Sequence, residues 1–405
     1  MDRNGQRLDN VISLDLKLQG LISSKLKNID QFNLTWSEFE LKESQEFLRE
    51  LKELSTIQSI GSSTRIEGSK LQDDEIKTLI DNLDINKLKS RDEEEVSGYY
   101  EALDLIYENH ENLFLSESYI KQLHAISLKY SSKDTRHRGD YKSLSNKVVA
   151  QYPDGSSRVV FDTTEPYLVA KEMTDLIDWS NERLSYSGIH SLMVIAVFVY
   201  EFLSIHPFQD GNGRLSRLLT NLLMMKSGYK FVQYISFEHV IEQRKKEYYQ
   251  NLMEAQSQRF TRHPAKHGFA SDVDINKVGT VRSASSANEE AEGFHVNCAA
   301  REDLGMWMVY FLDCVENLIS KLKTKLHTND DHCLDDSGVN LSSTQKQIYT
   351  LISTNKSSKV EDLMKVFPEI TRPTIKYSLS RLVELGLISR HGRGRGTWYQ
   401  TAKAY

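Results

Sequence analysis

One segment of the chain, HPFQDGNGRLSR, concentrates the residue types that phosphate chemistry requires. Its Gly211-Asn212-Gly213 turn stands directly before leucines at helical spacing, so the turn is expected at the N-terminus of a helix. Backbone N–H groups and the positive end of the helix dipole converge there, and glycine lets an anion approach the backbone closely. Arg214 and Arg217, three residues apart on that helix, would add two planar guanidinium groups. The segment therefore predicts a site that binds phosphate groups.

Two other side chains of the segment suit a reaction rather than binding alone. Asp210 is a hard oxygen ligand beside the expected phosphate site and suits Mg²⁺ that also contacts phosphate oxygens. His206 carries an imidazole that ordinarily titrates near neutrality, which makes it the expected general base for a hydroxyl group. A purely structural interpretation accounts for each residue singly, but not for all of them together. Together they indicate phosphoryl-type transfer.

Most of the chain around this segment has the apolar periodicity of helices. The helical ranges are 14–54, 73–83, 94–115, 118–130, 165–184, 191–205, 237–252 and 302–326. The range 191–205 is almost entirely apolar, so it is expected to form a buried central helix that leads directly to His206. Residues 147–152 and 158–161 flank the turn Pro153-Asp154-Gly155 and predict a β-hairpin. The predicted fold class is therefore mainly α.

The segment from His206 to Arg217 resembles the Fic family signature, His-x-Phe-x-Asp/Glu-Gly-Asn-Gly-Arg-x-x-Arg, and every defining position is matched. The similarity extends over roughly residues 59–249. It implies a Fic-type helical core with a β-hairpin flap, which uses ATP and Mg²⁺ to transfer AMP to Tyr, Thr or Ser hydroxyls of proteins. It also implies that His206 deprotonates the target hydroxyl and that Asp210 binds Mg²⁺.

The resemblance assigns further residues to the parts of ATP. Asn212 and the amides of Gly211 and Gly213 would hold the α- and β-phosphates. Arg214 would hold the β-phosphate and Arg217 the γ-phosphate.

Outside the phosphate site, the resemblance implies three other roles. Phe208 would be a core anchor that fixes the loop. Tyr248 and Tyr249, near the end of the expected helix 237–252, would line the adenine pocket. The hairpin resembles the flap that pairs with target backbone by strand addition, and the candidate residues are Val159, Val160 and Phe161.

A second motif resembles the Ser/Thr-x-x-x-Glu-Gly/Asn inhibitory pattern of Fic proteins that carry an N-terminal inhibitory helix. Its residues are Ser63, Glu67 and Gly68, on a short helix that the Gly-Ser-Ser-Thr segment at 61–64 would cap. If the Glu67 carboxylate pairs with Arg217, it occupies the group that the γ-phosphate needs, and resting activity is low. The alternative is that Glu67 is a surface acid and Ser63 an ordinary helix cap.

The C-terminal region has the pattern of a winged helix-turn-helix. Three helical ranges, 343–353, 360–367 and 371–385, precede two short β runs at 387–390 and 397–400. From residue 371 onward, seven Lys or Arg stand against one acid, which suits contact with DNA. Candidate contacts to DNA or a partner are Arg372, Lys376 and Arg381 on the third helix, with Arg393 and Arg395 in the wing. A protein-docking or dimerisation module remains the alternative, so a homo-oligomer stays open.

The whole chain supports several domains without a strong overall field. It has 405 residues, 39% apolar residues and a net charge of −6. We expect an N-terminal helical region at 1–95 that includes the inhibitory helix, and a core at 96–326 with an irregular insertion near 257–300. A linker at 327–342 and the winged domain at 343–405 follow. The apolar run at 192–200 is too short to span a bilayer and the start lacks a signal-peptide pattern, so a cytoplasmic protein without membrane contact is expected.

Three functions remain open from the sequence. The leading one is a self-inhibited protein adenylyltransferase that modifies an unidentified protein, including itself. A hydrolase could use the same site to remove AMP, with Glu67 orienting water, and a DNA-binding regulator could merely sense ATP. Binding alone does not require His206, which favours the enzymes over the sensor.

Overall fold

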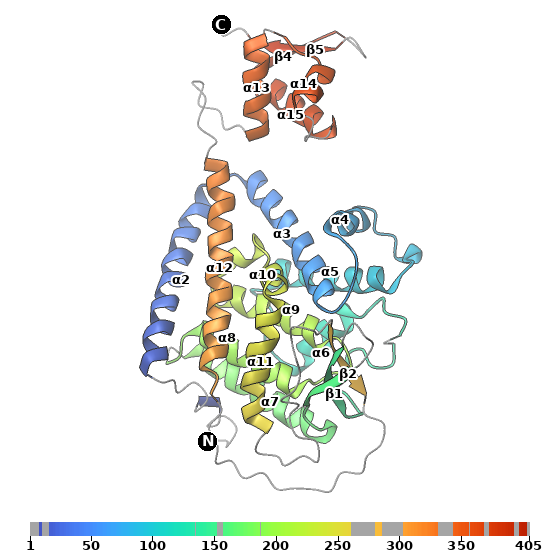
Figure 1. Cartoon of the computed structure of the whole chain (residues 1–405), viewed down its shortest axis with the longest axis vertical. Coiled ribbons are helices and arrows are strands. Elements are labelled where there is room, and N and C mark those ends of the chain that lie inside the picture. Colours follow the sequence, from blue (N-terminus) through green and yellow to red (C-terminus); the bar gives the residue numbers. More distant parts are fainter. Residues whose placement is uncertain are drawn as a thin grey trace. The chain divides into compact units, whose positions relative to one another are not determined.

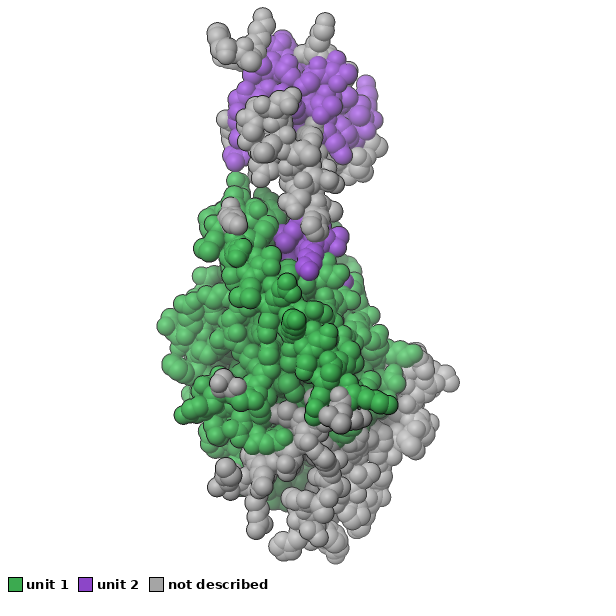
Figure 2. Space-filling view, turned by 90° about the vertical axis from the view of Figure 1, so that its left-hand side faces the viewer, with its two compact units in different colours: residues 1–320 green, residues 321–405 purple. Residues whose placement is uncertain are grey.

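The computed structural model describes residues 8–9, 16–133, 135–151, 157–186, 188–260, 280–285, 303–330, 343–355, 357–367, 372–392 and 397–402. The chain divides into two compact units, residues 1–320 and residues 321–405 (Figure 2). The division falls inside the long helix α12 (Gly305–Asp330), and each unit is described by itself. The finer boundaries expected at residues 95, 326 and 342 stay predictions.

Unit 1 is mainly helical, as the sequence predicted, with one small sheet (Figure 1). Its elements before the sheet are α2 (Leu16–Lys42), α3 (Gln45–Ile66), α4 (Asp73–Asp81), η1 (Ile85–Lys87), α5 (Arg91–Asn109) and α6 (Glu117–Ser127). Those that follow are β1 (Asn146–Gln151), β2 (Ser157–Asp162), α7 (Pro166–Ser185), α8 (Ser191–Ile205), α9 (Asn212–Lys226), η2 (Lys230–Gln233), α10 (Phe237–Gln243), α11 (Lys245–Phe260), β3 (Thr280–Ser285) and α12. Within the described residues, no helix is long and apolar enough to cross a membrane.

Helix α8 is the centre of the core, as its apolar sequence predicted. Nearly all of its side chains are buried, and it contacts both α7 and α9. The indole Nε1 of Trp307 on α12 donates a hydrogen bond of 2.8 Å to the Ala196 carbonyl oxygen. A helix that is apolar all round is stable only when neighbours cover every face. Helix α8 therefore fixes the point at which the chain leaves it for the loop at residue 206.

The sheet has three antiparallel strands in the order β2-β1-β3. Strands β1 and β2 form the predicted hairpin, with a register shift between Val148 and Val149. Strand β3 pairs with the other edge of β1, from Asn146 opposite Ser285 to Gln151 opposite Thr280. The expectation of an irregular insertion over 257–300 was wrong where α11 continues to Phe260 and where β3 forms. The β3 segment lacks strong local β patterning, and its strand arises from pairing with a distant partner.

Two helix boundaries differ from the sequence expectation. No short helix starts at residues 61–64, because α3 runs through them without a break and ends at Ile66. Gly68, whose φ is 106°, lies in the turn that follows. The Thr64 hydroxyl donates to the Ile60 carbonyl oxygen within the helix, so it is satisfied without acting as a cap. The expected single helix 237–252 is instead two helices, α10 and α11, that meet at Arg244.

Unit 2 contains α13 (Ser343–Asn355), α14 (Val360–Val366), α15 (Arg372–Glu384), β4 (Ile388–His391) and β5 (Trp398–Thr401). Strands β4 and β5 pair antiparallel. All three helices and both strands contribute to one core, made of Ile348, Ile352, Leu363, Ile375, Leu379, Leu382, Ile388 and Tyr399. This element order agrees with the expected winged arrangement.

Candidate functional site

The loop between α8 and α9 has an unusual backbone that its side chains hold in place. His206 has a left-handed φ of 53°, the one positive φ of a non-glycine residue in the described part of the chain. The Asn212 side chain accepts from the Phe208 amide at 2.9 Å and donates to the Phe208 carbonyl at 2.8 Å. Phe208 is fully buried and stacks on His124, with ring centroids 3.8 Å apart, so its expected role as a core anchor is confirmed. The Asn212 side chain, which the resemblance assigns to phosphate, bonds the loop backbone through both Oδ1 and Nδ2, and its phosphate contact stays a prediction.

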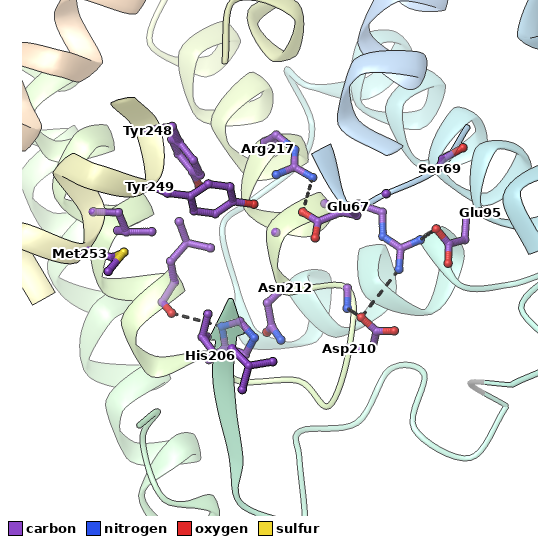
Figure 3. A pocket seen from close by; sticks show the side chains of 18 of the residues that line it. Glu67, Ser69, Glu95, His206, Asp210, Asn212, Arg217, Tyr248, Tyr249 and Met253 are labelled. Carbon is purple, nitrogen blue, oxygen red and sulfur yellow. Dashed lines mark hydrogen bonds and ion pairs between the residues drawn. The ribbon is translucent and has the colours of Figure 1, made fainter. Parts of the chain in front are cut away.

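The loop opens into a cavity of about 380 Å³ (Figure 3). The residues singled out from sequence that line it are Glu67, Gly68, His206, Asp210, Gly211, Asn212, Gly213, Arg214, Arg217, Tyr248 and Tyr249. They come from the loop between α8 and α9, from α9 and α11, and from the turn that follows α3, which are distant in sequence. Ser63 lies outside the lining, behind Arg217. The tertiary fold thus brings both motifs into one site.

His206 is buried and neutral at physiological pH. Its Nδ1 lies 3.3 Å from the Leu203 carbonyl oxygen, which can only accept, so Nδ1 carries the hydrogen and Nε2 the lone pair. Burial and the nearby charge of Lys142 lower the pKa of His206 to about 3. The expectation that this imidazole titrates near neutrality was wrong, because the sequence does not reveal how completely α8 and its neighbours exclude water.

Arg214 offers hydrogen-bond donors to a ligand. Its side chain is 3% exposed, and Nη1 lies 3.0 Å from Oε2 of Glu95 as an ion pair. Among the described residues, Nε of Arg214 has no hydrogen-bond acceptor, while Nη1 has the Glu95 ion pair but no well-aligned hydrogen bond. Buried donors normally have partners, so an Nε without one marks the place where a ligand supplies an acceptor. A phosphate group has the right charge and several oxygens.

Asp210 is an ionised carboxylate beside these donors. Burial raises its pKa, but the charge of Arg214 and a hydrogen bond from the Gly211 amide outweigh this, and the net pKa is below the ordinary value. No group of three or more His, Cys, Asp or Glu side chains in the described residues could hold a metal ion by itself. Mg²⁺ commonly takes one or two carboxylates together with phosphate oxygens. A single carboxylate next to a phosphate site fits that donor set.

Glu67 and Arg217 form the ion pair that the sequence suggested. Oε1 of Glu67 lies 2.7 Å from Nη2 of Arg217, whose side chain is 2% exposed. Arg217 also donates from Nε to the Ser63 hydroxyl at 2.8 Å and from Nη2 to the Ser63 carbonyl at 3.0 Å. A Cβ placed on Gly213 would come within 2.2 Å of Oε1 of Glu67. The carboxylate therefore lies directly against the first turn of α9, with Arg217 on one side (Figure 3).

The other end of the cavity is aromatic and apolar. Tyr248 and Tyr249 extend from α11, with ring centroids 5.1 Å apart, and Met253 follows on the same helix (Figure 3). Tyr248 is also 5.9 Å from the ring of Trp307. Such a wall suits a flat heterocycle.

Sequence reasoning missed several residues that support the loop. Arg91 donates to Glu95 at 2.6 Å and approaches Oδ2 of Asp210 to 3.5 Å. His124 contacts the Asp210 carbonyl oxygen through Nε2 at 3.0 Å, while its Nδ1 accepts from the Gly139 amide at 2.9 Å. The spacing of Arg91 and Glu95 predicts a helical ion pair, but nothing in the sequence places it beside the loop at residue 210.

The hairpin reaches the cavity through strand β1. Val148 and Val149 line the cavity. On β2, Phe161 pairs with Val148 and Val159 pairs with Val149, and Val160 lies at the register shift between them.

The basic residues of unit 2 that the sequence singled out differ in exposure and in partners. Arg372 is exposed and pairs with Glu361 at 3.1 Å, Lys376 is exposed, and Arg381 is half-buried. Arg393 and Arg395 lie outside the described residues. DNA contact by this group stays a prediction.

Comparison with known proteins supports the identity of the central region. Residues 114–224 match the model of the Fic/DOC family. The protein adenylyltransferase fic-1 of Caenorhabditis briggsae is 33% identical over 129 residues, which is 31% of this chain and 24% of that protein. The protein adenylyltransferase Fic of Drosophila willistoni is 29% identical over 228 residues, or 56% of this chain and 42% of that one. The chain thus spans less than half the length of these curated relatives.

Two solved structures share the fold. A Fic family protein from Desulfovibrio desulfuricans G20 aligns with 98% of each chain, at 19% identity and a TM-score of 0.56. Fic-1 from Caenorhabditis elegans aligns over 76% of this chain and 74% of that one, at 19% identity and a TM-score of 0.52. Residues 114–224 therefore form a Fic/DOC family domain, and the chain around them has the fold of Fic proteins.

Proposed function

We propose that the protein transfers AMP from ATP to a hydroxyl side chain of a protein. The observation that carries this proposal is the meeting, in one cavity, of a neutral buried imidazole at His206 and a buried guanidinium at Arg214 whose Nε has no acceptor among the described residues. A base beside a phosphate site is what nucleotidyl transfer to a hydroxyl needs, whereas ATP binding alone needs no base. The names of the curated relatives support the same activity.

In the proposed reaction, Nε2 of His206 accepts the proton of the target hydroxyl. The hydroxyl oxygen forms a bond to the α-phosphorus of ATP, the bond from that phosphorus to the bridging oxygen breaks, and pyrophosphate leaves. Because the Nδ1 hydrogen is held by the Leu203 carbonyl, the lone pair on Nε2 has a fixed direction. When Mg²⁺ is bound, it neutralises phosphate charge and orients the leaving group, and Asp210 is its proposed ligand.

The remaining groups hold the nucleotide. The amides of Asn212, Gly213 and Arg214 precede the first hydrogen bond of α9, from the Leu215 amide to the Gly211 carbonyl, so they have no acceptor within the helix. These amides and the Arg214 side chain face the α- and β-phosphates, and Arg217 faces the γ-phosphate. Tyr248 and Tyr249 pack on adenine.

Glu67 inhibits the resting protein in this proposal. Its carboxylate holds the Nη2 group of Arg217 and lies against Gly213, where phosphate oxygens would otherwise lie. Two anions cannot share this space, so ATP binds without the γ-phosphate contact and its α-phosphorus is misaligned. The protein is then an enzyme with low basal activity.

The target docks by adding a strand to the outer edge of β2, at Val159, Val160 and Phe161. Strand β1 is paired on both edges, with β2 on one side and β3 on the other. A target strand therefore meets the hairpin at β2 unless it first displaces β3. The class of target is a protein with a hydroxyl residue on an extended segment, and this includes a second copy of the chain.

The test is to incubate the protein with Mg²⁺ and ATP labelled at either the α- or the γ-phosphate. The variants are Glu67→Ala, His206→Ala in the Glu67→Ala background, and Glu50→Ala as the control, because Glu50 is an exposed acid on the same helix. We expect α-label on protein that is strongest in Glu67→Ala, unchanged in Glu50→Ala and lost without His206. Label from the γ-phosphate would indicate a kinase. Absence of label together with AMP release from a modified protein would establish the hydrolase instead.

A further inference from the structure

A buried lysine lies directly behind the loop. The Lys142 side chain is 4% exposed and precedes β1. Its Nζ donates to Oδ1 of Asn146 at 2.9 Å, to the Thr163 hydroxyl at 2.6 Å and to the Ile205 carbonyl at 3.2 Å. An ammonium group has three hydrogens, and this site supplies three acceptors.

The same cluster holds the backbone on both sides of His206. Lys142 donates from Nζ to the Ile205 carbonyl and from its own amide to the Pro207 carbonyl, at 2.9 Å. The Asn146 side chain donates to the Phe208 carbonyl at 3.0 Å. A left-handed conformation at a residue with a Cβ is strained, so it persists only when its surroundings fix it. Lys142 and Asn146 add fixing groups from outside the motif to those of Asn212 within it.

The cluster also joins the loop to the base of the hairpin. Asn146 is the first residue of β1, and Thr163 follows the last residue of β2. The Thr163 hydroxyl contacts both the backbone and the side-chain oxygen of Asn146, at 2.8 and 2.5 Å. One polar group therefore links both ends of the hairpin to the residues that flank His206.

Burial of a lysine at this position carries a desolvation cost. Burial lowers the pKa of Lys142 to about 7, and the charges of Glu165 and Glu172 only partly offset this. None of its three described acceptors is a carboxylate. An apolar residue would fill the same space without this desolvation, but would remove the donor that Lys142 gives to the Ile205 carbonyl and leave Oδ1 of Asn146 with the Thr163 hydroxyl alone.

We propose that Lys142 is a positioning residue, which fixes the His206 backbone and couples it to the base of the β1–β2 hairpin. The catalytic part of this inference rests on the proposed transfer of AMP. Because the target docks on the hairpin in that proposal, displacement of the hairpin shifts His206 relative to the hydroxyl that it deprotonates. Lys142 touches neither ATP nor the hydroxyl, and acts through the loop.

The test compares Lys142→Met, which keeps the length and loses the donors, with Thr163→Val, which removes one of the three acceptors of Nζ together with the hydroxyl that bonds Asn146. Lys171→Met is the control, since Lys171 is a lysine of α7 with 62% of its side chain exposed. In the Glu67→Ala background we expect kcat for α-label transfer to fall about 10- to 100-fold in Lys142→Met, and less in Thr163→Val. The Kd of ATP should stay within about twofold, because the phosphate groups are untouched.

Hydrogen exchange of backbone amides makes the inference testable without activity. Lys142→Met should increase exchange in residues 146–151 and in residues 206–212 together, whereas Lys171→Met should change neither. Unchanged kcat in folded Lys142→Met, or an equal loss of kcat and ATP affinity, would overturn the positioning role. If the Glu67→Ala parent transfers no label, the proposed function fails and exchange alone decides: faster exchange in both segments supports the coupling, and any other pattern refutes it.

Discussion

Oε1 of Glu67 and Nη2 of Arg217 lie 2.7 Å apart, although 150 residues separate them in the chain. The pair joins the C-terminal end of α3 to the first turns of α9. It gives a buried guanidinium a counter-charge in the absence of nucleotide. In the proposed function, this same contact competes with a phosphate group for Arg217.

Removal of the Glu67 carboxylate should lower the stability of the protein and increase its stabilisation by ATP. Glu67→Ala leaves Arg217 with the Ser63 contacts alone, and we expect the free energy of unfolding to fall by about 1–3 kcal/mol. Mg²⁺ and ATP should then raise the melting temperature more in Glu67→Ala than in wild type, since ligand binding stabilises the folded state. Thermal unfolding with and without Mg²⁺-ATP measures both effects, with Glu50→Ala as the control. An equal ATP shift in all three proteins would contradict competition for Arg217.

The effects of substituting Gly213 and Glu67 on the free energy of unfolding should be coupled. A Cβ on Gly213 would lie 2.2 Å from Oε1 of Glu67 and 3.3 Å from Nη1 of Arg217. Gly213→Ala should therefore displace the Glu67 side chain and destabilise wild type, but have little effect in Glu67→Ala. A double-mutant cycle on the free energy of unfolding should show a coupling of about 0.5–3 kcal/mol. Additive effects of the two substitutions would show that the contact is relieved without loss of the ion pair.

The pH dependence of stability should report the burial of His206. Its folded pKa is about 3, below the ordinary value of 6.5, so the unfolded state binds the proton more tightly. The contribution is fully present above pH 6.5 and is lost as pH falls towards 3, at about 1.4 kcal/mol for each pH unit. The unfolding free energy of wild type minus that of His206→Gln should decline between pH 6.5 and 5. A difference that stays constant over this range would mean that the pKa of His206 in the folded protein lies at its ordinary value.

Two helix glycines should respond in opposite directions to the same substitution. A Cβ on Gly98 of α5 would lie 2.2 Å from the Ser127 carbonyl oxygen at the end of α6, and this backbone atom cannot move alone. Gly98→Ala should destabilise the protein by about 1–3 kcal/mol. Gly20 of α2 has no atom within 4 Å of the added Cβ, so Gly20→Ala should stabilise by about 0.5–1 kcal/mol. Chemical denaturation of both variants tests the close α5–α6 contact, and equal effects would exclude it.

The sequence predicted features that depend on neighbours along the chain. The apolar run of α8 and the leucines of α9 are local patterns, because helical periodicity is set within a few turns. Fixed motif spacing likewise singled out the loop from His206 to Arg217 and the segment at Glu67, and both line the same cavity. Boundaries failed where side chains found tertiary partners, as at Ser63, which lies in the last turns of α3 and bonds Arg217 instead of capping a new helix.

Only the tertiary structure decided how the site is supported and how it titrates. Lys142 and His124 reach the loop from segments whose sequence has no marker of that contact, and β3 forms only because β1 offers it an edge. The pKa of His206 falls to about 3 through burial and the charge of Lys142, whereas its residue type alone suggested a value near neutrality. Solvation and charge at a point depend on every segment packed there, and these segments are brought together by folding rather than by spacing along the chain.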